Sequence, residues 1–129
     1  MSPGGSTRKV RITAGDVAVT ATLNGSATAD KVWQALPIRA RASTWGDEIY
    51  FSTPVSAGEA NDATDVFERG AVAYWPPGKA LCLFFGPTPA STGDEPRMAS
   101  PGNLVGMIEG TLDPLRTVSS GAQITVERA

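Results

Sequence analysis

Histidine is absent from this 129-residue sequence, and cysteine occurs only once, as Cys82. Histidine is the commonest general base and metal ligand in proteins. Without histidine or a second cysteine, the chain cannot assemble the usual zinc sites or an internal disulfide. We therefore expect no metal and no other cofactor, and any proton transfer would have to use Lys, Arg, Asp or Glu.

Positive charge and long apolar runs are also scarce. The formal net charge is −2 at pH 7 and no basic stripe is visible, which argues against a nucleic-acid partner. No apolar run approaches the roughly 18 residues that a membrane span requires, and residues 1–9 lack the hydrophobic core of a secretory signal. The sequence thus predicts a cytoplasmic protein that binds neither nucleic acid nor membrane.

The length of the chain suits one domain. Residues 1–8 are rich in Gly, Ser and Pro and are expected to form a disordered lead-in, whereas residues 9–129 are expected to form the folded domain. Such a domain buries about two-thirds of its unfolded surface and needs no disulfide. Cys82 lies within an apolar run, which predicts a buried small hydrophobe rather than a reactive thiol.

The segment from Gly70 to Gly86 contains two apolar runs joined by a Trp-Pro-Pro-Gly turn. The second run has no polar residue from Ala80 to Phe85. A strand that is apolar at successive positions has to be buried on both faces. This segment is therefore predicted to be the central hairpin of the fold.

Alternating polar and apolar residues predict most of the other elements. A helix over residues 29–36 should begin after the cap Thr28 and end at Pro37, and long loops are expected over residues 54–65 and 87–102. The other predicted elements are strands over residues 9–13, 17–23, 38–45, 48–51, 103–109 and 122–128, and a second short helix over residues 112–118. About eight strands with so few helices predict a mainly β fold, a closed eight-stranded barrel capped by two short helices.

None of the common catalytic or ligand-binding motifs is complete. Pro76-Pro-Gly-Lys79 lacks the first Gly and the final Ser or Thr of a phosphate loop. The acidic residues of the loop over residues 54–65 do not have calcium-loop spacing. Asp47 and Glu48 are neighbours on a predicted strand and should point to opposite faces, which makes them a poor acid–base pair.

Two long segments nevertheless resemble the cyclophilin-like family of small bacterial and archaeal proteins. They are Thr44–Val55 and Gly70–Pro89, the latter including Tyr74–Gly86, and Asn103–Gly110 is similar to a later Phe-Gly-Lys-Val segment of true cyclophilins. The resemblance extends from about Lys9 to the end of the chain. It implies an eight-stranded barrel with two helices, related in fold to the peptidyl-prolyl cis-trans isomerases.

True cyclophilins isomerise X-Pro bonds, whose barrier of ~18–20 kcal/mol comes from amide resonance. The family is thought to lower this barrier with an arginine. Counting from Gly46 places that arginine on or beside Ala42, so the resemblance implies Arg41 or Arg39 as the catalytic residue. These two arginines share one face of the predicted strand.

The resemblance also implies a substrate-binding groove. Counting without gaps places Tyr50 at a groove Gln, Glu48 at a pocket Met, Trp75 at a groove Asn and Phe85 at the pocket Phe. Trp45 adjoins these positions. An aromatic groove of this kind suits an apolar or planar small ligand at least as well as a peptide.

The chain departs from the family in its polar groove residues. Leu83 stands at a second groove Gln, Gly102 at the pocket His, and residues 87–102 contain no Trp. Each lost hydrogen bond to a peptide would weaken specific binding by about 1 kcal/mol. We therefore expect a small molecule or a proline-containing peptide as the partner, and the oligomeric state stays open.

Three functions follow as hypotheses. The first is the binding of a small apolar molecule or peptide in the Arg/aromatic groove. The second is an isomerase or cyclase that steers a small substrate by shape and one arginine, which needs little acid–base machinery. The alternative to both is a peptidyl-prolyl cis-trans isomerase acting on X-Pro bonds.

Overall fold

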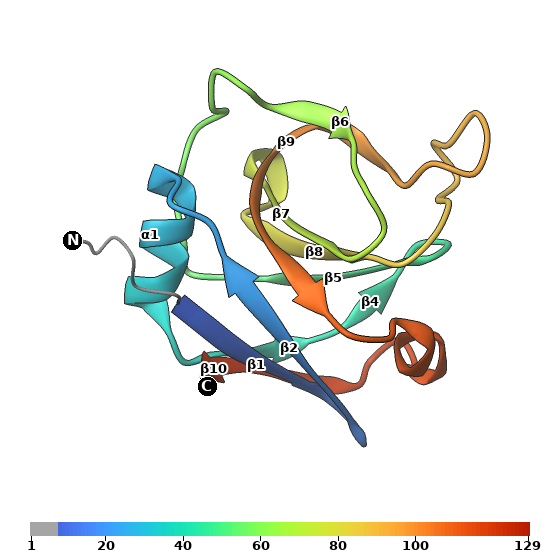
Figure 1. Cartoon of the computed structure of the whole chain (residues 1–129), viewed down its shortest axis with the longest axis horizontal. Coiled ribbons are helices and arrows are strands. Elements are labelled where there is room, and N and C mark those ends of the chain that lie inside the picture. Colours follow the sequence, from blue (N-terminus) through green and yellow to red (C-terminus); the bar gives the residue numbers. More distant parts are fainter. Residues whose placement is uncertain (1–7) are drawn as a thin grey trace.

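The computed structural model describes residues 8–129 and consists mainly of β-strands (Figure 1). The strands are β1 (Arg8–Ala14), β2 (Val17–Leu23), β3 (Ile38–Arg41), β4 (Ser43–Thr44), β5 (Glu48–Ser52), β6 (Thr64–Val66), β7 (Ala71–Trp75), β8 (Ala80–Phe84), β9 (Arg97–Glu109) and β10 (Gln123–Arg128). One α-helix, α1 (Ala27–Ala35), and two 3-10 helices, η1 (Pro76–Gly78) and η2 (Asp113–Thr117), complete the described elements. The predicted lead-in over residues 1–8 lies outside the described residues except for Arg8, which begins β1.

The prediction of a mainly β fold is confirmed, but the prediction of a closed eight-stranded barrel is wrong. The described strands number ten, and their hydrogen-bonded order is β3-β10-β1-β2-β9-β7-β8-β5-β4, with β6 paired to β9. Two differences raise the number of strands above the predicted eight. The predicted strand over residues 38–45 is divided at Ala42 into β3 and β4, and β6 forms where a loop was expected.

The two end strands of the sheet are consecutive in the chain and are separated at Ala42. β3 pairs with β10 and β4 pairs with β5, so neither strand pairs with both neighbours and the hydrogen-bonded order stays open. At the junction, Ala42 donates to the oxygen of Ala122 and accepts from the N–H of Gly121. The chain thus crosses from one end of the curled sheet to the other through one residue.

β9 is longer than predicted and begins within the expected loop over residues 87–102. It pairs in turn with β6, β7 and β2, and Figure 1 shows it as one long curved strand. The Ser, Pro and Gly at residues 100–102 indicated a loop, yet Gly102 pairs with Thr64 of β6. Tertiary pairing therefore overrides the local turn signal at this point.

The N-terminal end of α1 also differs from the prediction. Ser26, not Thr28, caps the helix, because its Oγ accepts from the N–H of Ala29 at 3.1 Å. Thr28 lies inside the first turn, where its buried hydroxyl accepts from the side-chain amide of Asn103 at 3.0 Å. The second predicted helix is the 3-10 helix η2.

Two apolar clusters lie on opposite faces of the strands β5, β7 and β8. The first, here called the main core, includes Val10, Ile12, Ile49, Phe51, Val72, Tyr74, Leu81, Leu83, Val105, Ile124 and Val126. The second, here called the outer cluster, consists of Phe67, Ala71, Ala73, Cys82, Phe84 and Met98, with Trp75 and Met107 packed against it. Every residue of β8 is buried, which confirms the prediction for the central hairpin and for Cys82.

Candidate functional site

A cavity of about 180 Å³ opens beside the outer cluster and is here called the aromatic pocket. It is lined by Trp45, Glu48, Tyr50, Trp75, Cys82, Met98 and Ala99. Four of the seven predicted site residues, Trp45, Glu48, Tyr50 and Trp75, therefore lie around one hollow. The lining residues come from β5, β7, β8, β9 and the turn that precedes β5.

Strand alternation in β5 explains which of its side chains reach the pocket. Ile49 and Phe51 belong to the main core, so Glu48 and Tyr50 point to the other face. Tyr50 is directly opposite Cys82 of β8 in the antiparallel ladder. The predicted central hairpin thus forms the floor of the pocket, and β5 forms one wall.

The turn before β5 places Trp45. Gly46 has a φ of 62°, which favours glycine. A Cβ at this position would lie 2.9 Å from the Cα of Thr88, so the turn also packs closely against the neighbouring loop. The N–H of Trp45 donates to the oxygen of Glu48 at 2.9 Å and completes the turn.

Two contacts hold the ring of Trp75, one with Ser100 of β9 and one within the Trp-Pro-Pro-Gly motif. The indole Nε1 donates to the hydroxyl of Ser100 at 2.8 Å. Gly78 lies against the six-membered ring, where an added Cβ would be only 2.8 Å from Cε3 and Cζ3. The motif that identified the hairpin therefore also fixes the ring of Trp75 at the pocket.

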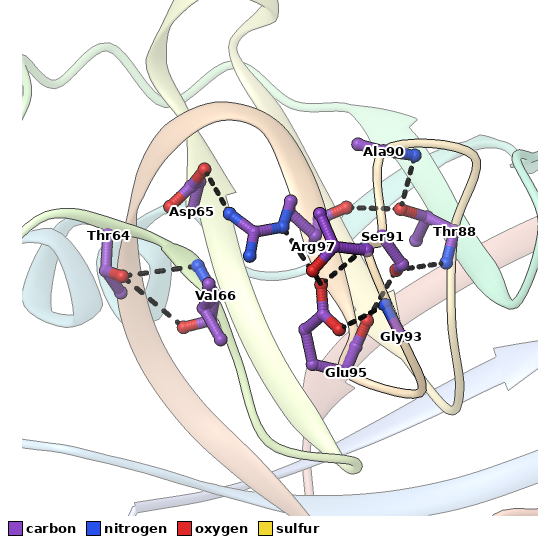
Figure 2. A network of polar contacts seen from close by, with 10 residues as sticks. Thr64, Asp65, Val66, Thr88, Ala90, Ser91, Gly93, Glu95 and Arg97 are labelled. Atoms are coloured by element: carbon purple, nitrogen blue, oxygen red, sulfur yellow. Dashed lines mark hydrogen bonds and ion pairs between the residues drawn. The ribbon is translucent and has the colours of Figure 1, made fainter.

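A polar network supports the part of the wall formed by Met98 and Ala99 (Figure 2). The guanidinium of Arg97 forms ion pairs with Asp65 and Glu95, each at 3.0 Å. The N–H of Thr92 and the side chain of Arg97 lower the pKa of Glu95 to about 2. The network ties β6 and the loop after β8 to the first residues of β9.

Glu48 is the one ionisable carboxyl that lines the aromatic pocket. It is only 4% exposed, and its Oε1 has no hydrogen-bond partner among residues 8–129. Burial raises its pKa from 4.5 to about 7, and the neighbouring Cys82 offsets part of the rise. Burial also raises the pKa of the Cys82 thiol, and Glu48 adds to that effect. The carboxyl can therefore exchange its proton near neutral pH.

The two predicted catalytic arginines are not among the residues that line this pocket. Arg39 and Arg41 are exposed on β3, at the other end of the hydrogen-bonded strand order from β4 and β5. Arg41 donates to the oxygen of Gly121 at 3.0 Å. Arg39 lines a separate depression of about 300 Å³ with residues of β10. Their catalytic role stays a prediction, but the pocket does not include them.

Phe85 is also outside the aromatic pocket. It is 5% exposed and belongs to the main core. Arg116 of η2 lies over its ring at 5.3 Å and forms an ion pair with Asp47 at 3.0 Å. The side chain of Phe85 therefore packs in the main core and does not line the pocket.

Sequence reasoning missed three lining residues: Cys82, Met98 and Ala99. Cys82 was predicted to be buried, and its pairing with Tyr50 could have placed it beside the groove. Met98 and Ala99 lay in a segment interpreted as a loop, so no pattern linked them to the hairpin. Their place depends on the pairing of β9 with β6.

In the part of the chain that the structure describes, no group of three or more His, Cys, Asp or Glu could hold a metal ion. None of the helices in residues 8–129 has both the length and the apolar character that crossing a membrane requires.

The chain is similar to a known family and to a solved structure. The sequence model of a family described as Cyclophilin-like matches residues 8–127. The solution structure of a hypothetical protein from Archaeoglobus fulgidus is 40% identical in sequence, covers 100% of both chains and has a TM-score of 0.83. No curated protein matches this sequence.

Proposed function

Because the chain belongs to the Cyclophilin-like family, we propose that it binds a small apolar molecule, or one apolar side chain of a peptide, in the aromatic pocket. The observation that carries this proposal is the convergence of Trp45, Tyr50 and Trp75 on one cavity with a buried carboxyl. A pocket with apolar walls and few polar groups is typical of ligand sites. The fold alone does not imply an activity, so the proposal rests on the pocket.

The volume of the pocket limits the size of its ligand. Sites for drug-sized molecules usually enclose ~300–1,000 Å³, whereas this cavity has about 180 Å³. The cavity therefore suits one ring or one compact group. A larger molecule or a peptide would place only part of itself inside.

A binding experiment with small ring compounds tests the proposal. We expect some members of a panel of single-ring compounds to bind the wild-type chain in calorimetric titrations and to lose at least about fivefold in affinity on Trp75→Ala, since a buried aromatic contact contributes of the order of 1 kcal/mol or more. Leu104→Ala is the matched control, because Leu104 is 41% exposed and does not line the pocket. Absence of binding across the panel, or equal losses in both variants, would contradict the proposal.

Peptidyl-prolyl isomerase activity is the second candidate. A cavity of about 180 Å³ can hold one proline ring, and this observation favours it together with the family. An isomerase or cyclase for a small substrate would use the same cavity. A protease-coupled proline-peptide assay tests the candidate: a rate equal to that of buffer eliminates it, and a rate that falls in Arg41→Ala or Arg39→Ala supports the predicted arginine mechanism.

A further inference from the structure

We propose that the aromatic pocket binds the compact alkylammonium group of a small organic cation, with Glu48 as its counter-charge. This inference rests on the proposed function and specifies the chemical class of the ligand. Three independent features support it: the aromatic lining, the buried carboxyl and the absence of a competing cation. The chain itself also provides a comparison site.

The aromatic lining suits a cation because the face of an aromatic ring carries negative electrostatic potential. Trp45, Tyr50 and Trp75 contribute three such rings to one cavity. Tryptophan attracts cations most strongly, and quaternary ammonium groups are typical ligands of aromatic cages. The fixed position of Trp75, between Ser100 and Gly78, means that its ring needs little rearrangement on binding.

The buried carboxyl of Glu48 favours a cationic ligand over a neutral one. A buried carboxyl is normally paired with a cation or fully hydrogen-bonded. Glu48 is 4% exposed, and its Oε1 has no partner within the described chain. A bound cation would give this oxygen the partner that the chain does not provide.

None of the residues that line the pocket is a cation that could pair with the carboxyl of Glu48. From β8 the thiol of Cys82 adjoins it, from β5 the phenol of Tyr50 lines the same cavity, and β9 contributes only Met98 and Ala99. No lysine or arginine among residues 8–129 lines the pocket. The nearest charge in sequence, Asp47, is paired with Arg116 at 3.0 Å.

The third tryptophan shows how this chain arranges an aromatic ring with its own cations. The guanidinium groups of Arg8 and Arg128 lie 5.9 and 4.4 Å from the ring centre of Trp33. No lysine or arginine from residues 8–129 lies over Trp45 or Trp75 in this way. The aromatic pocket combines rings and a carboxyl but receives no cation from the described chain.

The size of the cavity fits the same class of ligand. Its volume of about 180 Å³ is below the ~300–1,000 Å³ of sites that hold drug-sized molecules. A quaternary ammonium group has five heavy atoms, so it fits where a drug-sized molecule does not. We therefore expect the cationic group to enter the pocket and the rest of the ligand to extend into solvent.

A pair of isosteres tests the charge separately from the shape. Choline and 3,3-dimethyl-1-butanol differ only in the replacement of the positive nitrogen by carbon. At pH 8, where Glu48 is mainly ionised, calorimetric titration should show that choline binds at least about tenfold more tightly, because a desolvated cation gains from both the rings and the carboxylate. In Glu48→Gln this preference should fall to about twofold or less, whereas Glu59→Gln, which removes an exposed carboxylate that does not line the pocket, should retain it.

The pH dependence provides a second measurement. Choline should bind more weakly as the pH falls from 8 to 6, since the carboxyl is then protonated, and binding at pH 6 should release a proton. A neutral ligand that accepts a hydrogen bond from the protonated carboxyl would show the opposite trend. The pH dependence expected for choline should disappear in Glu48→Gln.

The possible failures are distinguishable. Equal binding of the two isosteres, or a choline preference that survives Glu48→Gln, would overturn the inference but leave the proposed function intact. Binding of single-ring compounds without binding of choline would have the same meaning. If neither isostere nor any ring compound binds, both the inference and the proposed function are wrong.

Discussion

The strands β5 and β8 present two very different faces. On one face, Ile49 and Leu83 are fully buried in the main core among apolar side chains. On the other face of the same strands, Glu48 and Cys82 border a cavity of about 180 Å³. The first face is apolar and buried, as is usual in a core, whereas the second has a cavity and a buried carboxyl. Such local exceptions are expected at functional sites rather than in structural cores.

The two faces also differ in what packs against them. The main core receives side chains from most of the strands of the curled sheet and from α1. The outer cluster consists of only six buried residues, with Trp75 and Met107 packed against it. The aromatic pocket opens beside this smaller cluster.

The largest expected effect is the loss of stability from a truncation in the main core. Leu83→Ala should lower the free energy of unfolding by about 2–5 kcal/mol, because it removes a fully buried side chain and leaves a void. Cys82→Ala, one residue away on the pocket face, should cost only about 0.5–1.5 kcal/mol. Urea unfolding of both variants measures the contrast, and equal losses would show that the two faces are packed alike.

The second prediction concerns the pH dependence of stability. The pKa of Glu48 is raised from 4.5 to about 7 by burial, so between these values the folded state binds more protons than the unfolded state. The free energy of unfolding should therefore fall as the pH rises through this window, by at most about 3 kcal/mol. Glu48→Gln should remove this fall and be the more stable protein at pH 8.

The control for this experiment is Glu59→Gln, which removes an exposed carboxylate from the loop before β6. Urea unfolding at pH 4.5, 6 and 8 provides the data. A constant difference between the wild type and Glu48→Gln across these pH values would mean that the carboxyl does not titrate there. The contrast between the two faces of β5 would then concern shape alone.

The third prediction concerns a substitution outside the pocket that should displace part of the pocket wall. In Gly78→Ala the new methyl group would displace the ring of Trp75 and weaken its bond to Ser100. We expect a loss of about 1–3 kcal/mol in stability and weaker ligand binding in the aromatic pocket. Gly25→Ala is the matched control, since nothing lies within 4 Å of an added Cβ there. Unchanged binding in Gly78→Ala would show that the position of Trp75 is unimportant.

The smallest effects are expected at the two arginines of β3. Arg39→Ala and Arg41→Ala should each change the free energy of unfolding by less than about 0.5 kcal/mol, as exposed substitutions usually do. Affinity for ligands of the aromatic pocket should stay the same within error. Calorimetric titration checks this, and a strong loss of binding in either variant would extend the ligand site to β3.

Much of the fold could be predicted from the sequence because its signals are local. The β1–β2 hairpin, β5, the β7–β8 hairpin and β10 lie close to where alternation or continuous apolar runs placed them. The division of the strand at Ala42 could not be predicted, since both halves alternate without a break. β6 and the first half of β9 were missed because Gly, Pro and Ser indicate a loop until a partner strand is present.

The site was predicted only in part for the same reason. Trp45, Glu48, Tyr50 and Trp75 were found through their place in two motifs, and the structure brings all four together. Phe85 was assigned to the same groove, but alternation along the chain turns it into the main core. Met98 and Ala99 come from a strand whose position depends on a distant pairing.

The sequence by itself determined the family, the mainly β character and the doubly buried hairpin from Gly70 to Gly86, because these depend on residue types and short periods. Only the tertiary structure decided that the sheet stays open, that Arg39 and Arg41 do not line the pocket, and that Oε1 of Glu48 has no hydrogen-bond partner among residues 8–129. Those outcomes depend on which strands meet. Pairing between residues far apart in the chain is a property of the whole fold rather than of any segment.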